Sequence, residues 1–304
     1  NWFNDDQWNN IIHNMKLISK AAKAGNCAGI CLDVEPYGDG IFQYPGPKDK
    51  YASKSFTEVA AKVRQRGIQF MKALQTEMPD MKLLQFFQMA IYESLFDIIN
   101  LEERKEKLYT HTSTYLRLNS TYYNPWYTNL SLAYPFFLGM LEGAGPGITF
   151  IDGNEGSYYY EEPEQFYRAY HTIKNRALTM IPEELRTKYK TQVDVGMAVY
   201  TNQMLGRYRG SAVYMSPKDR LKLFEHNLYY ALQTSDEYVW FYTDWPLTWW
   251  YDFLPGKRGI SLPEGTEEAM RSTITKYENG KPLGFDLTSE IAVAKEKAKA
   301  DTQE

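Results

Sequence analysis

The stretch GICLDVEPY, residues 29–37, decides how the rest of the chain is interpreted. It predicts a buried strand, and successive side chains of a strand point to opposite faces of a sheet. Ile30 and Leu32 then share an apolar face suited to lie under helices, while Asp33 and Glu35 share the other face. Because unpaired buried charge is costly, we expect this end of the strand to open into a polar cleft. The alternative is that both acids are salt-bridged on a surface loop.

Four further strands are expected downstream, each separated from the next by at least one helix. The strands are predicted at 82–87, 148–152, 193–200 and 238–244. Helices are predicted at 5–25, 55–78, 92–107, 125–142, 161–190, 217–233, 264–277 and 289–299. This alternation is typical of β/α units that build a parallel sheet.

Two α/β architectures fit this pattern. A doubly wound sheet often carries a Gly-rich phosphate loop, and the sequence contains no GxGxxG motif. Long polar and aromatic loops after nearly every strand instead favour a (β/α)8 TIM barrel over residues 1–285, followed by a surface helix or tail at 286–304. A barrel needs eight strands, so the numbered chain would cover strands four to eight, with the N-terminal strands absent from it. If no upstream segment exists, the doubly wound sheet becomes the better supported prediction.

Composition limits the classes of partner. The 304 residues include 38 acidic and 34 basic ones, and a net charge of −4 offers no broad basic field for nucleic acid. No run of about 18 apolar residues occurs, so no membrane span is predicted. The chain has 25 Tyr, 15 Phe and 7 Trp, many of them in polar segments. Flat amphipathic rings in loops suit a sugar, which makes a carbohydrate the expected partner.

Carboxylates follow two of the predicted strands. The third strand ends in Asp152, followed by Asn154 and Glu155. Glycoside hydrolysis needs one protonated acid and a second carboxylate that acts as nucleophile or base. Repulsion between Asp33 and Glu35 would tend to keep one of them protonated, as a general acid requires. We therefore expect Glu35 to be the acid, Asp152 or Glu155 the second carboxylate, and Asp33 to orient Glu35 or bind a sugar hydroxyl.

The residues expected to bind the substrate are aromatic or polar and lie near strand ends. They are Tyr37, Asn154, Tyr200, Trp240, Tyr242, Asp244 and Trp245. Simpler roles stay open for several candidates. Asp152 is also a good turn former after a strand, and Glu155 could cap the next segment. The aromatic loop at 245–251 could be a hydrophobic lid.

Other chemistries are less well supported. The four histidines lie at no predicted strand end, which disfavours a hydrolytic zinc site, and no G-x-S-x-G motif points to a serine nucleophile. No cofactor is expected. A calcium or magnesium site built from Asp33, Glu35 and Asp152 remains open and would make the protein a metal-assisted hydrolase or lyase. A carbohydrate-binding barrel without catalysis is the other alternative.

The acidic strand at 29–37, the strand-end acids and the aromatic last strand together resemble the TIM-barrel glycoside hydrolases. The resemblance covers most of the chain, at the level of pattern. It implies a glycosidase, and polysaccharide degradation would favour a secreted or periplasmic location. In some of these families the second catalytic acid follows strand six, which would be Asp152 or Glu155. In others it lies on strand seven, where this chain has Tyr200 and no acid.

Overall fold

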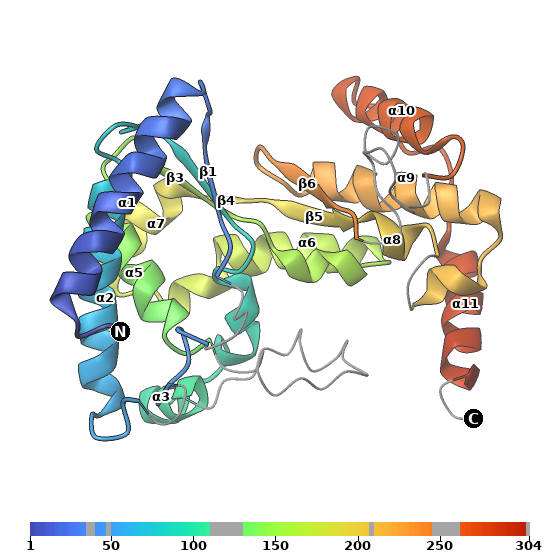
Figure 1. The fold of residues 1–304 in the computed structure, drawn as a ribbon. Coiled ribbons are helices and arrows are strands. Elements are labelled where there is room, and N and C mark those ends of the chain that lie inside the picture. The colour runs from blue at the N-terminus through green and yellow to red at the C-terminus, as the bar shows by residue number, and fades with distance from the viewer. Residues whose placement is uncertain (35–39, 47–49, 110–129, 207–209, 245–261, 302–304) are drawn as a thin grey trace, which may run out of the picture. The chain divides into compact units, whose positions relative to one another are not determined.

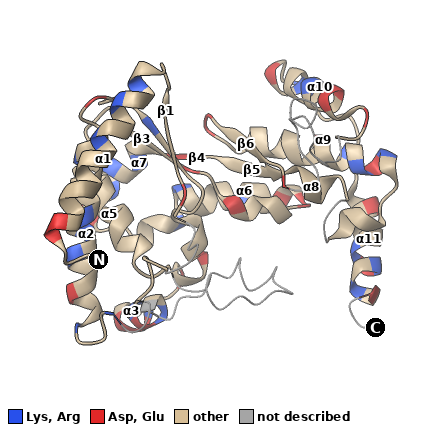
Figure 2. Ribbon diagram, in the orientation of Figure 1, with Lys and Arg blue, Asp and Glu red and all other residues tan. Residues whose placement is uncertain are grey.

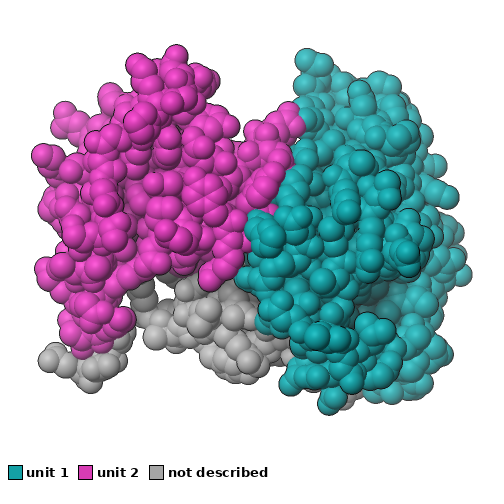
Figure 3. Space-filling view, turned by 180° about the vertical axis from the view of Figure 1, so that it is seen from behind, with its two compact units in different colours: residues 1–154, 171–195 teal, residues 155–170, 196–304 magenta. Residues whose placement is uncertain are grey.

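The protein consists of two compact units. The computed structural model describes residues 1–34, 40–46, 50–109, 130–206, 210–244 and 262–301. Unit 1 comprises residues 1–154 and 171–195, and unit 2 comprises residues 155–170 and 196–304 (Figure 3). Each unit has a parallel sheet of its own, so the predicted mixed α/β class with parallel strands is confirmed.

Unit 1 is built on a four-stranded parallel sheet (Figure 1). Its strands are β1 (Gly29–Leu32), β2 (Lys82–Gln85), β3 (Thr149–Asp152) and β4 (Val193–Val195). They are neighbours in chain order, from β1 to β4. A doubly wound sheet reverses its strand order at one point, and this sheet has no such reversal.

The helices described in unit 1 are α1 (Asp5–Ala24), α2 (Phe56–Leu74), η2 (Ala90–Leu95), α3 (Leu101–Tyr109), α5 (Ala133–Gly143), η5 (Arg176–Thr179) and α7 (Glu183–Gln192). Three of them, namely α1, α2 and α3, begin at a residue whose side chain caps the helix. Ser55 and Glu58 form the capping box of α2. The single helix predicted at 92–107 is wrong, because the side chain of Asn100 accepts the N–H groups of Glu102 and Glu103 and starts a separate helix, α3.

One face of the sheet lies under the helices. Leu83, Phe150 and Val193 are fully buried and lie in register across β2, β3 and β4. The ring of Phe150 meets that of Phe137 from α5 edge-on, with centroids 5.7 Å apart. On the opposite face of β1, Cys31 is exposed. The sheet therefore has one well-packed face and one more open face at β1.

The helices α2 and α5 touch through their backbones. A Cβ atom built on Gly67 would lie 2.2 Å from the carbonyl oxygen of Phe136, and one on Gly139 would lie 1.9 Å from that of Arg64. Neither distance leaves room for a side chain. Glycine at these two positions thus sets the distance at which α5 lies against α2 (Figure 1).

Arg66 of α2 binds residues at the N-terminus of the chain. Its side chain is only 3 % exposed and donates to the carbonyl oxygen of Trp2 at 2.9 Å and to Asp5. The guanidinium also lies over the ring of Trp8, 5.0 Å from the centroid. The buried cation is thus held by a carbonyl, a carboxylate and an aromatic face.

We expect Arg66→Ala to lower the free energy of unfolding by about 2–4 kcal/mol, because it removes a buried cation from its partners and leaves a carbonyl unpaired. Lys62→Ala is the matched control, since Lys62 contacts the same Asp5 at 3.5 Å from a more exposed position. It should cost less than about 1 kcal/mol. Urea unfolding curves measure both values, and equal effects would contradict this role of Arg66.

Unit 2 is built on a two-stranded parallel sheet. Its strands are β5 (Met197–Tyr200) and β6 (Val239–Tyr242). Its helices are η4 (Glu155–Tyr159), α8 (Thr201–Met204), η6 (Ser211–Tyr214), α9 (Pro217–Gln233), α10 (Thr266–Glu278) and α11 (Thr288–Asp301). Helix α6 (Pro163–Lys174) contains a boundary between the units. Val199 and Phe241 lie in register, and the ring of Phe241 contacts Phe224 of α9.

The single strand predicted at 193–200 is wrong. Strand β4 ends at Val195 and pairs with β3, whereas β5 begins at Met197 and pairs with β6. Gly196 lies between them. Glycine weakens a strand, because it contributes no side chain to the packing and loses the most backbone freedom on ordering. The break therefore falls at the position least able to continue the strand.

Helix α11 lies on the surface of unit 2, and its Lys and Glu residues are intermixed (Figure 2). It is nevertheless anchored, because Ile291 and Ala294 are buried and Lys295 contacts Glu161 and Glu162 at 3.4 and 2.7 Å. None of the helices in the described part of the chain combines the length and apolar character needed to cross a membrane.

Candidate functional site

The predicted site begins at the end of β1. Asp33 directly follows this strand and is exposed. Three other predicted site residues, Glu35, Tyr37 and Trp245, lie outside the described residues. The expected general acid and its neighbouring aromatic residue therefore remain sequence predictions.

Asp152, at the end of β3, is fully buried. One oxygen of its carboxyl group, Oδ2, accepts the backbone N–H groups of Met89 and Ala90 at 2.8 and 2.9 Å. The other oxygen, Oδ1, accepts that of Asn154 at 3.2 Å. Burial raises the pKa of Asp152 to about 6, and the three hydrogen bonds oppose this rise. Asp152 thus connects the end of β3 to the start of η2 in the buried interior of unit 1.

The register of the sheet decides which way Asp152 points. Leu32, Gln85 and Asp152 are aligned across β1, β2 and β3. Side chains two residues apart share a face, so Asp152 is on the same face as Phe150, under the helices. The Asp152 side chain therefore lies on the face of the sheet opposite to that of Cys31, and its role as a catalytic carboxylate stays a prediction.

Asn154 and Glu155 follow β3 in a tight turn. Asn154 has a positive φ of 41° and is buried, and Asn tolerates this conformation better than most residues. Glu155 is half-buried and begins η4. Asn154 thus belongs to the turn that Asp152 holds, whereas Glu155 starts the next element in unit 2.

Three of the predicted substrate-binding aromatics come together in unit 2. The rings of Tyr200, Trp240 and Tyr242 surround Tyr158, with centroids 5.1, 5.4 and 5.7 Å from it. Tyr158 and Tyr242 are stacked, with an angle of 18° between the ring planes. Tyr158 and Tyr200 are buried, whereas Tyr242 is 42 % exposed. We call these four side chains the aromatic cluster, and Tyr242 presents its surface to solvent.

Tyr158, at the centre of the aromatic cluster, is absent from the predicted site. It lies on η4, which is fixed to β5 by Ser157. The hydroxyl of Ser157 donates to the carbonyl oxygen of Ala198 at 2.8 Å and accepts the N–H of the same residue at 2.7 Å. The only sequence signal for this position is the run of three tyrosines at 158–160.

Asp244 follows β6 and is exposed. Its backbone forms two hydrogen bonds with the side chain of Asn202. Asn202 Nδ2 donates to the carbonyl oxygen of Asp244 at 2.7 Å, and its Oδ1 accepts the Asp244 N–H at 3.0 Å. Asn202, which no motif indicates, therefore fixes the backbone that carries the Asp244 carboxylate.

The described residues thus contain an exposed aromatic face in unit 2, with an exposed carboxylate two residues further along the same chain segment. Stacking on a sugar ring needs such a face. Among the residues with described positions, no group of three His, Cys, Asp or Glu side chains could hold a metal ion.

Comparisons with known proteins add no assignment to this geometry. No family model matches the chain, and neither a curated protein nor a solved structure was found to be similar to it.

Proposed function

We propose that this protein hydrolyses glycosidic bonds. The observation that carries the proposal is the aromatic cluster, in which Tyr242 lies at the carboxyl end of a parallel strand and exposes its ring. Active sites of parallel α/β proteins lie at this end of the strands. An exposed ring beside an exposed Asp244 suits a ligand that has apolar faces and hydroxyl groups.

We further propose that the strands belong to a (β/α)8 barrel. In both sheets the strands are parallel and follow chain order, which is how strands succeed one another around a barrel. The neighbouring helices of unit 1, α1, α2 and α5, also succeed one another in chain order. Both features support the barrel over a doubly wound sheet.

Glu35 is the general acid in this proposal, and Asp33 assists it. For the second carboxylate, Glu155 is favoured over Asp152. Both oxygens of Asp152 accept backbone N–H groups and the side chain is fully buried, so they are not accessible to a sugar. Glu155 is only half-buried.

A glycan panel tests the activity. We expect the wild-type protein to release reducing sugar from at least one glycan, and Glu35→Gln to lower kcat at least about 100-fold, because the variant cannot donate the proton. Tyr242→Ala should mainly raise KM for the same glycan. Tyr277→Ala is its control, since Tyr277 is a similarly exposed tyrosine on α10.

The outcomes separate the alternatives. Equal rates for wild type and Glu35→Gln would exclude Glu35 as the acid. A glycan that binds both proteins without product would favour a carbohydrate-binding protein. Activity that disappears with EDTA and returns with Ca²⁺ or Mg²⁺ would favour a metal-assisted reaction. Parallel assays of Asp152→Asn and Glu155→Gln would identify the second carboxylate.

A further inference from the structure

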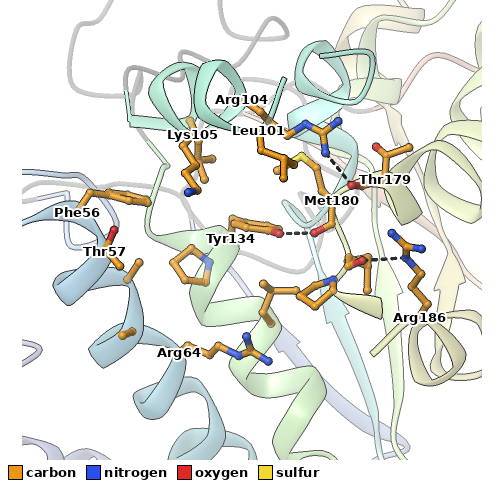
Figure 4. A pocket seen from close by; sticks show the side chains of 17 residues that line it. Phe56, Thr57, Arg64, Leu101, Arg104, Lys105, Tyr134, Thr179, Met180 and Arg186 are labelled. Carbon is orange, nitrogen blue, oxygen red and sulfur yellow. Dashed lines mark hydrogen bonds between the residues drawn. The ribbon is translucent and has the colours of Figure 1, made fainter. Parts of the chain in front are cut away.

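A cavity of about 570 Å³ lies among the helices of unit 1, and none of its described lining residues belongs to the predicted site. It is open to solvent and is lined by residues of α2, α3, α5 and the segment at 179–186 (Figure 4). Its size is within the usual range for small-molecule sites, about 300–1,000 Å³. Its apolar walls include Phe56, Leu101, Leu108, Pro135, Leu138 and Ile181.

All charged side chains among the described lining residues are cationic, namely those of Arg64, Arg104, Lys105 and Arg186. Arg64 contacts Glu142 and Glu184 at 2.8 and 3.5 Å, and Lys105 contacts Glu102 at 2.7 Å. These three glutamates are not among the described lining residues of the cavity.

Arg104 and Arg186 have no acidic partner among the described residues. The guanidinium of Arg104 donates to the carbonyl oxygen of Thr179 (Figure 4). It also donates to the carbonyl oxygen of Ile98. Arg186 Nε donates to the carbonyl oxygen of Ile181 at 3.0 Å. No carboxylate among the described residues lies within 4 Å of either guanidinium. Two positive charges therefore border an apolar cavity without a negative partner from these residues.

The neutral polar groups of the lining are largely engaged within the protein. The Tyr134 hydroxyl donates to the carbonyl oxygen of Met180, and that of Thr179 donates to the carbonyl oxygen of Phe96 at 3.2 Å. Burial raises the pKa of Tyr134 to about 12, and Arg64 and Arg104 lower it, so this hydroxyl stays protonated and adds no negative charge. A sugar would find few partners for its hydroxyl groups here.

We propose that this cavity binds a small aliphatic carboxylate, with the chain against the apolar walls and the anionic head beside Arg104 or Arg186. Guanidinium groups match carboxylate geometry and form charge-assisted hydrogen bonds. The apolar chain is favoured by removal of its surface from water. Neither contribution requires glycosidase activity.

Octanoate is the probe, and octanamide has the same chain with an uncharged head. Isothermal titration calorimetry of the whole chain measures the Kd of each. We expect octanoate to bind at least about tenfold more tightly than octanamide, the equivalent of about 1.4 kcal/mol for one charge-assisted contact. Either Arg104→Gln or Arg186→Gln, whichever removes the arginine beside the head, should weaken octanoate binding by a similar factor and leave octanamide binding unchanged.

Two exposed aliphatic residues near the start of α3 provide a matched pair of variants. Leu101 lines the cavity and is 66 % exposed, whereas Ile99 is 92 % exposed and outside the lining. Leu101→Glu should weaken octanoate binding at least about tenfold through charge repulsion, and Ile99→Glu should leave it within about twofold. Both exposed substitutions should preserve the circular dichroism spectrum and Tm.

Absence of octanoate binding to the wild type, equal affinities for the two probes, or equal effects of the two variants would overturn the proposal.

Discussion

Replacing Gly139 with alanine is expected to lower the free energy of unfolding by about 3 kcal/mol. In an exposed helix the same change would stabilise the protein by about 1 kcal/mol, because alanine is the better helix former. Here the new Cβ atom would lie 1.9 Å from the carbonyl oxygen of Arg64. That neighbour is backbone, so the contact is relieved only if α5 moves away from α2.

The substitution Gly139→Ala would disturb more than the contact between α5 and α2. Moving α5 would also loosen the ring of Phe137 from Phe150 and so disturb the core above β3. Chemical unfolding measured by tryptophan fluorescence gives the change in free energy. Gly145→Ala is the control, because its Cβ would meet only the flexible side chain of Gln75, at 3.3 Å. It should change stability by less than about 1 kcal/mol, and a similar loss in both variants would contradict the backbone clash.

The second large effect concerns Asp152 and depends on pH. Its folded pKa of about 6 lies above the ordinary value of 3.8, so the folded state favours the protonated carboxyl group. This contribution to stability is fully present below pH 3.8 and is lost as pH rises through 6. A shift of about two units corresponds to roughly 3 kcal/mol at most.

Asp152→Asn and Asp152→Ala cannot titrate at this position. The free energy of unfolding of each variant, minus that of wild type, should therefore rise by roughly 3 kcal/mol between pH 3.5 and pH 7. This difference should change with pH equally in the two variants, and its value at any one pH should differ between them by a constant amount. The alanine variant should be the less stable, by roughly 2 kcal/mol, because it leaves the N–H groups of Met89 and Ala90 unpaired.

Subtraction of the wild-type curve is essential because of His226. Burial lowers the pKa of this histidine to about 4, so its contribution to stability is lost as pH falls from 6.5 to 4. The slopes from Asp152 and His226 thus oppose each other in the wild-type curve. His226 is present in all three proteins, so its effect cancels in the difference. Urea unfolding at four pH values between 3.5 and 7 measures the effect, and flat differences would contradict the role of burial.

The local pattern predicted most of the secondary structure. Helix α9 spans Pro217–Gln233, as expected, because Ser216 caps it by accepting the N–H of Asp219. Strands also form at the five positions where they were expected. Short apolar runs between helices are the reason, because they suit buried strands and are too short for helices. The break at Gly196 was not predictable, because it depends on which neighbouring strand each half pairs with.

The candidate site was predicted less well. The aromatic cluster follows from strand ends that carry Tyr200, Trp240 and Tyr242, which the alternating pattern identifies. The environment of Asp152 depends on N–H groups of Met89 and Ala90, which are more than 60 positions away in the chain. No spacing rule connects such residues. A buried structural carboxylate therefore looks like a catalytic one in the sequence.

The division of the chain limits how the protein can be dissected by truncation. The polypeptide chain crosses from one unit to the other after residues 154, 170 and 195, so neither unit is a continuous piece of sequence. A fragment that begins at Gly196 would retain β5 and β6 but lose Ser157, whose hydroxyl holds both backbone groups of Ala198. It would also lose Tyr158, the centre of the aromatic cluster. Point substitutions, or a circular permutation that keeps η4 with β5, are therefore the suitable tools for studying unit 2.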